Sequence, residues 1–582
     1  MRKSKIKRIR PRAHSFVLAV VLVVFVVAVF GPVVKAGKKW RYSLEPPVTL
    51  DFDMEDIAEP EERERSYYYD FLYSTFGLQV KEGLDFPRNF RKLAGKPKQA
   101  YNVNVLGEVP DSSWFTNRNT KRQMTLEEIR RGPNLSSGPA PGLWKVIQGK
   151  TEGITPGFLI RDSAGEIYQL KFDPPEFPEM ATAAEVIDSK LYHGAGYNVK
   201  ENYIVVFLRE RLVMDPEAGI LDRYGRKSRM TAADVEGILR RVPRSPDGRY
   251  RAVAGKYLPG IAKGPFAFEG VRKDDPNDWI PHEHRRDLRG LRIFCSWVNE
   301  NDMREGNTLD MYVEEGGRRF LRHYIIDLGS SLGSETNGPN PDRIGNEYIL
   351  DGGEILKSAL SLGIYRRPWE GTGSAIPYPA VGFLEAEIFD PGRWKANYPI
   401  LPFENMTLRD AFWGTKLVLS FTDEQIRAAV ETGEFSDPAA TELLTRVMIQ
   451  RRDKIGRYWL NRVNPLDRFA VSRGADGELQ LRFVDLAVYH DFVSRQDRSY
   501  EFTIREESNP SRVLRRKKTE EPVITLPELG QEEGKSAGLR VYQVSIRTFG
   551  ARGKALGKAV HVYLVRRLDT DSVDVVGIER TD

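Results

Sequence analysis

Three residues near the middle of the chain have the types and spacing that transfer of a phosphoryl group requires. Asn307 follows Asp302 by five positions, and Asp327 follows Asn307 by 20. In this chemistry one aspartate accepts the proton of the attacking hydroxyl, and an asparagine and a second aspartate hold Mg²⁺ on the phosphates. The three side chains therefore predict a catalytic loop and a metal site.

A second group of residues upstream has the features of a phosphate-binding site. A turn over residues 149–157 contains Gly149, Gly153 and Gly157, Lys171 ends an expected strand, and Glu185 lies on the helix expected next. A glycine turn lets backbone N–H groups approach phosphates. A strand lysine binds phosphate oxygens, and a glutamate on a helix holds that lysine in place. The order of the two groups predicts phosphoryl transfer from ATP with Mg²⁺ as cofactor.

Regular elements are expected to position these residues. Residues 158–172 read as two strands around a turn at 162–165, and a helix begins near Pro178 and stops at Gly194 or Gly196. A hairpin with strands at 308–313 and 320–326 connects Asn307 to Asp327. Further expected elements are a buried strand at 203–207, a helix at 291–299 and helices throughout 404–464.

The pattern predicts an α+β protein with four parts. Residues 1–36 form a leader, 37–140 an extended arm that wraps the body, 141–465 the main domain, and 466–582 a small β domain, expected to be a sandwich. Within the last part we expect a hairpin over 469–483, and strands at 541–549, 560–568 and 573–578. The basic stretch 515–522 is expected to be a solvated loop.

Residues about 142–464 resemble an atypical protein-kinase-like domain, of the broad group that holds the HipA-type and spore-coat CotH-type kinases. The matching stretches are Tyr168–Lys171, Ala184-Glu185 with Gly194–Gly196, Asn301-Asp302 with Asn307, and Ile325–Gly329. Two departures are that Glu300-Asn301, not His-Arg, precedes Asp302, and that Leu328 replaces the usual Phe.

This resemblance implies a bilobal fold with the nucleotide between a small lobe (about 142–208) and a helical lobe (about 285–464). Lys171 would bind phosphate with Glu185 as its partner, Asp302 would be the base, and Asn307 and Asp327 would hold the metal. Arg304 falls where kinases often place a phosphate-neutralising Lys or Arg. The substrate would be a hydroxyl of a protein, a glycan or a lipid.

The N-terminal segment predicts export. Residues 1–36 contain eight basic residues and no acid, and residues 15–34 are uncharged. Such a segment is a signal peptide, cut before Gly37, or a single membrane anchor, and either holds the body outside the cytoplasm, in the periplasm or cell envelope. The formal charge is +6 for the whole chain and −2 without the leader, so the body gives no reason to expect a nucleic-acid partner.

Three alternatives accompany the kinase-like interpretation. Because ATP is scarce outside the cytoplasm, the body could be an inactive pseudokinase-type protein that binds or scaffolds an envelope partner. The stretch 329–333 fits the G-x-S-x-G pattern of serine hydrolases, with Ser331 as nucleophile and His490 or His561 as base. His282 and His284 flank a glutamate, which suggests a metal site, although the spacing is not that of a common zinc motif.

Overall fold

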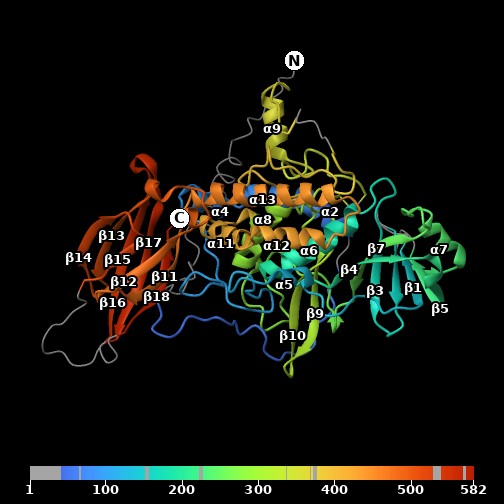
Figure 1. Cartoon of the computed structure of the whole chain (residues 1–582), viewed down its shortest axis with the longest axis horizontal. Helices are drawn as coiled ribbons and strands as arrows, with labels where there is room; N and C mark the ends of the chain where they lie inside the picture. Colours follow the sequence, from blue (N-terminus) through green and yellow to red (C-terminus); the bar gives the residue numbers. More distant parts are fainter. Residues whose placement is uncertain are drawn as a thin grey trace, which may run out of the picture.

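The computed structural model describes residues 41–64, 67–150, 156–221, 227–335, 337–367, 369–370, 376–527, 539–567 and 572–581. The leader predicted at 1–36 lies outside these ranges. Among the helices that the structure describes, none is both long and apolar enough to span a bilayer. The fold is α+β, as predicted, with strand-rich units at the two ends of the long axis and helices between them (Figure 1).

The first strand-rich unit is a seven-stranded sheet in the order β4-β7-β3-β2-β1-β5-β6. Its neighbouring strands are antiparallel except for β1 and β5, which are parallel. Its strands are β1 (Trp144–Lys150), β2 (Gly157–Arg161), β3 (Ile167–Lys171), β4 (Asn202–Phe207), β5 (Leu212–Leu221), β6 (Lys227–Arg229) and β7 (Tyr250–Lys256). Helix α7 (Ala232–Leu239) contributes Val235 and Ile238 to the apolar core of this unit.

Helix α6 (Met180–Ala195) follows β3 and joins the sheet to the helical part of the molecule. Nearly all of its residues are buried, and it ends at Gly196, whose φ of 127° favours glycine. The helix and its C-terminal end both agree with the sequence prediction. Because α6 carries Glu185 and follows directly on Lys171, the local fold brings these two residues near each other.

The helical part surrounds α8 (Arg286–Val298), which is buried along almost its whole length. Around it lie α10 (Leu401–Glu404), α11 (Leu408–Leu419), α12 (Asp423–Glu431) and α13 (Pro438–Leu460). One large apolar core joins these helices to α6. Within that core the indole of Trp297 donates a hydrogen bond to the carbonyl of Met448 at 2.9 Å.

The predicted hairpin between Asn307 and Asp327 is present. Strands β9 (Thr308–Glu315) and β10 (Arg318–Ile325) pair antiparallel, with Thr308 opposite Ile325 and a turn at Gly316-Gly317. The short strand β8 (Ile261–Ala262) extends this sheet on the other side of β9. Downstream, helix α9 (Gly352–Leu360) projects from the body at the top of Figure 1.

The stretch before the seven-stranded sheet is more helical than expected. It contains α2 (Tyr67–Leu72), a π-helical turn (Tyr73–Gly77), α3 (Leu78–Leu84), α4 (Phe86–Leu93) and α5 (Leu126–Arg131). The segment before α2 touches distant parts of the chain, since the N–H of Ser43 bonds to the carbonyl of Val576 at 3.1 Å and the N–H of Ile57 to that of Arg319 at 2.8 Å.

The C-terminal unit has two sheets that share one apolar core. The smaller holds β11 (Leu466–Arg473), β12 (Leu479–Asp485) and β15 (Val523–Thr525). The larger has the order β14-β13-β16-β17-β18, with β13 (Ser499–Glu506), β14 (Asn509–Thr519), β16 (Leu539–Phe549), β17 (Ala555–Arg567) and β18 (Ser572–Arg580). The short helix α14 (Leu486–Tyr489) connects the two sheets.

The prediction of a loop at 515–522 is wrong over most of its length, because residues 515–519 belong to β14. This strand lies at the edge of its sheet and most of its side chains are exposed. Lysine and arginine on an edge strand keep other chains from pairing with it. The basic composition that suggested a loop therefore fits a protected edge strand.

Candidate functional site

Lys171 is the centre of the candidate site. Its Nζ lies 3.0 Å from Oε2 of Glu185 and 2.7 Å from Oδ1 of Asp327. Lys171 ends β3, Glu185 is on α6, and Asp327 follows β10, so three separate elements meet here. Burial alone would lower the pKa of Lys171, but the two carboxylates raise it above its usual value and keep the ammonium charged.

The predicted catalytic loop forms a second, adjoining set of bonds. The amide nitrogen of Asn307 donates to the backbone carbonyl of Asp302 at 2.8 Å and to its Oδ2 at 3.0 Å. Nε of Arg304 lies 3.3 Å from Oδ1 of Asp302. The backbone N–H of Asp302 donates to Oε1 of Glu300 at 2.9 Å. The orientation of Asp302 is therefore fixed from its side chain and from its backbone.

The hairpin β9–β10 brings the two predicted metal ligands to neighbouring positions. Its register ends with Thr308 opposite Ile325, and the N–H of Ile326 donates to the carbonyl of Asn307 at 3.0 Å. Asp327 then has a φ of 60°, a conformation that costs energy for a residue with a side chain and is often found at functional sites. Its side chain is 49% exposed, so a ligand from solvent can reach its carboxylate.

Gly149 and Gly157, the ends of the predicted glycine turn, belong to strands β1 and β2 and lie at the same end of the sheet as Lys171. Strands β1 and β2 pair so that Gly149 is opposite Phe158, and β2 and β3 pair so that Gly157 is opposite Lys171. Only glycine fits at position 157, because a Cβ there would lie 2.4 Å from the carbonyl oxygen of Leu170. Gly153 lies outside the described residues, as does the rest of 151–155.

Lys200 is a residue of the site that the sequence did not indicate. It precedes β4, and its Nζ lies 3.3 Å from Oε1 of Glu185, so Glu185 pairs with two lysines. Burial lowers the pKa of Lys200, while Glu185 opposes that shift. No motif marks this position, since Lys200 reaches Glu185 only through the packing of β4 against α6.

Two further acids lie behind the catalytic loop. Asp188, one turn after Glu185 on α6, is fully buried, and within the described chain neither of its carboxylate oxygens has a hydrogen-bond partner. Burial raises the pKa of Asp188 well above its usual range. Burial and the nearby Asp188 do the same to the pKa of Glu300. Burial thus disfavours the charged form of both groups.

Asp188→Asn is expected to stabilise the protein increasingly as the pH rises. The folded chain keeps the proton of Asp188 above the pH at which the unfolded chain loses it, so this acid lowers stability as pH rises above about 4. Asparagine removes that dependence. Melting temperatures at pH 5 and pH 8 would show a gain that is larger at pH 8. The exposed Asp574→Asn should change neither value, and an Asp188→Asn gain that is the same at both pH values would contradict the assignment.

The hydrolase alternative does not fit the geometry. Ser331 is fully buried, and its hydroxyl donates to the carbonyl of Leu328 at 2.9 Å. His490 follows α14, and His561 lies in β17, where its Nδ1 is bonded to Ser545 at 2.8 Å. A nucleophile needs a base within hydrogen-bond reach, and the described contacts of these histidines do not include Ser331.

The two histidines that suggested a metal site lie in a turn just before α8. Nε2 of His282 is 2.7 Å from Asp278, and its ring packs on Trp114. Nδ1 of His284 is 2.6 Å from Arg289. Within the described part of the chain, His, Cys, Asp and Glu form no group of three or more that could hold a metal ion. These histidines are structural.

The residues present at the loop nevertheless fit Mg²⁺ shared with phosphates. Mg²⁺ prefers oxygen ligands and is usually held by one or two carboxylates together with substrate phosphates. Asp327 offers a solvent-accessible carboxylate. Asn307 uses its amide nitrogen on Asp302, which leaves its carbonyl oxygen as the atom that can face a cation.

Comparisons with known proteins add a distant structural likeness. No family description matches the sequence, and no curated protein matches it. A crystal structure of the Golgi casein kinase is similar over 70% of this chain and 94% of that chain, with 11% identity and a TM-score of 0.28. The structure of the Golgi casein kinase with Mn/ADP bound covers 69% of this chain and 95% of that chain, with 10% identity and a TM-score of 0.27.

Proposed function

We propose that this chain is a kinase-like phosphotransferase that acts outside the cytoplasm. It transfers the terminal phosphoryl group of ATP, with Mg²⁺, to a hydroxyl of a protein, a glycan or a lipid. The observation that carries this proposal is the meeting of Glu185 and Asp327 at Lys171, from separate elements, with Asp302 and Asn307 bonded to each other beside them.

Each side chain has a role that its surroundings support. Lys171, kept charged by Asp327 and Glu185, binds phosphate oxygens. Asp302 accepts the proton of the attacking hydroxyl, and Arg304 offsets negative charge that develops on the phosphoryl group. Asn307 and Asp327 would hold Mg²⁺, which when bound supplies charge neutralisation on the phosphates. In the described structure Asp327 bonds directly to Lys171, so a phosphate group that enters would exchange for that contact.

The first test is a thermal shift of the protein with and without ATP and Mg²⁺. A ligand that binds only the folded state stabilises it and so raises the melting temperature. At a ligand concentration of 100 times the dissociation constant, the stabilisation is about 2.7 kcal/mol. We expect a rise that depends on Mg²⁺, and we expect Asp327→Ala to lose it. Asp574→Ala, which removes an exposed carboxylate from the C-terminal unit, should keep the full rise.

The outcome also separates the enzyme from the pseudokinase-type alternative. A Mg²⁺-dependent shift without any turnover would support an inactive nucleotide-binding protein. If ATP, other nucleotides and Mn²⁺ all leave the melting temperature unchanged, the phosphotransferase proposal fails. A protein that binds or scaffolds an envelope partner would then be the better interpretation.

A further inference from the structure

Helix α4 has its polar and apolar faces reversed relative to an ordinary surface helix. Its apolar residues Phe86, Phe90 and Leu93 recur at helical spacing and are 67%, 73% and 88% exposed. Two of its three basic residues, Arg88 and Arg91, are half-buried against the body, and the third, Lys92, is exposed. In water this arrangement is unfavourable, since a surface helix normally buries its apolar stripe. The exposed stripe therefore indicates a surface that something covers.

The exposed apolar side chains continue onto neighbouring helices. On α2, the π-helical turn and α3 they are Phe71, Leu72, Phe76, Val80 and Leu84. On and after α9 they are Ile355, Leu356, Leu360, Leu362 and Ile364. The two sets adjoin, because the side chain of Gln79 on α3 accepts a hydrogen bond from the N–H of Gly352 at 3.3 Å. We call these residues, together with Phe86, Phe90 and Leu93, the apolar face.

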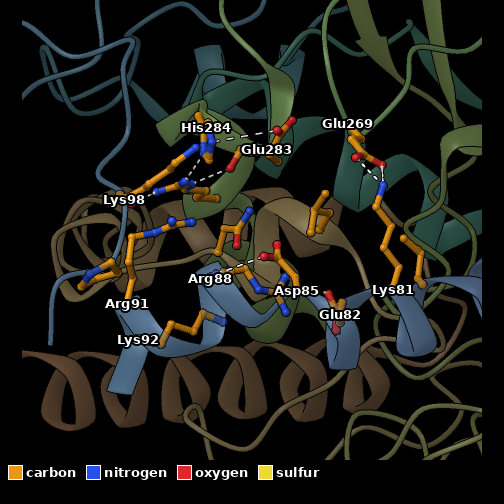
Figure 2. Close-up of a pocket in the computed structure, with 15 residues that line it drawn as sticks. Lys81, Glu82, Asp85, Arg88, Arg91, Lys92, Lys98, Glu269, Glu283 and His284 are labelled. Atoms are coloured by element: carbon orange, nitrogen blue, oxygen red, sulfur yellow. Dashed lines mark hydrogen bonds and ion pairs between the residues drawn. The ribbon is translucent and has the colours of Figure 1, made fainter. Parts of the chain in front are cut away.

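A pocket with more basic than acidic side chains in its lining, called the basic pocket below, adjoins this face; its acids are Glu82, Asp85, Glu269 and Glu283. It has a volume of about 130 Å³, enough for one phosphate group, and Figure 2 shows Arg88, Arg91, Lys92 and Lys98 gathered on one side of it. Nε of Arg91, and Nε and Nη1 of Arg88, are buried without a hydrogen-bond partner among the described residues. Nη1 of Arg88 does form an ion pair with Oε1 of Glu82 at 3.5 Å. The pocket thus holds buried donors that an anion would satisfy.

We propose that the apolar face lies on the surface of an anionic lipid bilayer, with a headgroup phosphate in the basic pocket. A helix that lies in the interface buries its apolar side chains about 5–10 Å deep, which places its other face at the level of the headgroups. Cations behind an inserted apolar stripe would therefore meet phosphates. This proposal does not depend on the phosphotransferase function.

Two features favour a bilayer over a protein partner. The sequence predicts that residues 1–36 direct this chain to a membrane and that their basic residues stay on its far side. Positive charge is also concentrated beside the apolar face. Residues 81–98 contain six basic and two acidic residues, whereas the body outside the leader has a net charge of −2. That local excess complements anionic headgroups.

The test measures the depth of single spin labels on the full chain in lipid nanodiscs. The native Cys295 is fully buried, so labels attach to introduced cysteines. Leu93→Cys and Leu360→Cys probe the apolar face, and Leu135→Cys is a matched control, because Leu135 is 90% exposed on another part of the surface. In discs containing phosphatidylglycerol we expect the first two labels to gain access to oxygen and to lose access to a water-soluble nickel chelate. The control label should stay accessible to nickel.

Several results would overturn the proposal. Labels at 93 and 360 that remain as accessible to nickel as the control would show that the face stays in water. Labels shielded from both reagents, with lipid and without it, would show that a second copy of the chain or the leader covers the face. Arg91→Gln combined with Lys98→Gln should weaken the depth signal in anionic discs. Phosphatidylcholine headgroups carry a phosphate but no net charge, so an equal signal in purely phosphatidylcholine discs would contradict the requirement for an anionic bilayer.

Discussion

Asp302→Asn is expected to reduce phosphoryl transfer by at least about 100-fold while leaving nucleotide binding intact, since general-base catalysis typically contributes 10²–10⁴-fold. Asparagine has nearly the same size as aspartate but cannot accept the proton of the attacking hydroxyl. Because Lys171, Asn307 and Asp327 remain in place, ATP with Mg²⁺ should still raise the melting temperature. The measurement is the release or transfer of labelled terminal phosphate, read beside the thermal shift on the same protein sample.

A second substitution in the same loop tests whether the loss of turnover comes from the carboxylate of Asp302 itself. Arg304→Ala removes the charge that lies 3.3 Å from Asp302 but keeps the carboxylate, so its turnover should fall less than that of Asp302→Asn. Unchanged turnover in Asp302→Asn would show that another group takes the proton. A loss of the thermal shift together with turnover would instead mean that Asp302 supports the nucleotide site.

The parts of the site that follow from local sequence were predictable. The alternation of apolar residues on either side of Glu314–Gly317 specified the hairpin β9–β10, and that hairpin fixes the separation of Asn307 and Asp327. Helical spacing after Pro178 likewise placed Glu185 on a helix that directly follows the Lys171 strand. Short connections between neighbouring elements bring their ends together, so order along the chain was informative here.

Other features depend on contacts between distant segments, which the sequence alone does not show. Neither Lys200 nor Asp188 belongs to a motif, and only packing shows that Asp188 is buried and that Lys200 is half-buried beside the site. The helices α2–α4 were missed because most of their apolar residues are exposed, so the pattern could not be matched to a buried face. Strand β14 was missed because an exposed edge strand has few apolar residues.

Asp410→Ala is expected to lower the stability of the helical part by about 3–5 kcal/mol, the usual cost of removing one partner of a buried ion pair. Asp410 is fully buried on α11, with Oδ1 3.0 Å from Nε of Arg286 and Oδ2 3.2 Å from Nη1 of Arg289. Its loss leaves two buried guanidinium groups without their shared carboxylate. Urea unfolding followed by tryptophan fluorescence should show the transition of the helical part at lower urea.

Asp234→Ala is the matched control for this prediction. Asp234 and Asp410 both close a capping box at the third position of a helix, but only Asp410 also pairs with buried arginines. Asp234→Ala should therefore cost only about 1 kcal/mol, the typical value of a helix cap. If the two substitutions destabilise the protein equally, the effect of Asp410 comes from its cap and not from the ion pairs.

The pH dependence provides an independent check on the same residue. Burial tends to raise the pKa of Asp410, but Arg286 and Arg289 hold it below its usual value. A carboxyl whose pKa is lower in the folded state stabilises the protein above its unfolded pKa of about 3.9 and loses that contribution as pH falls through the folded value. The difference between the wild type and Asp410→Ala should thus be constant from pH 8 to pH 5, and should shrink below about pH 4. A difference that is already smaller at pH 6 would mean that Asp410 is not held ionised by these arginines.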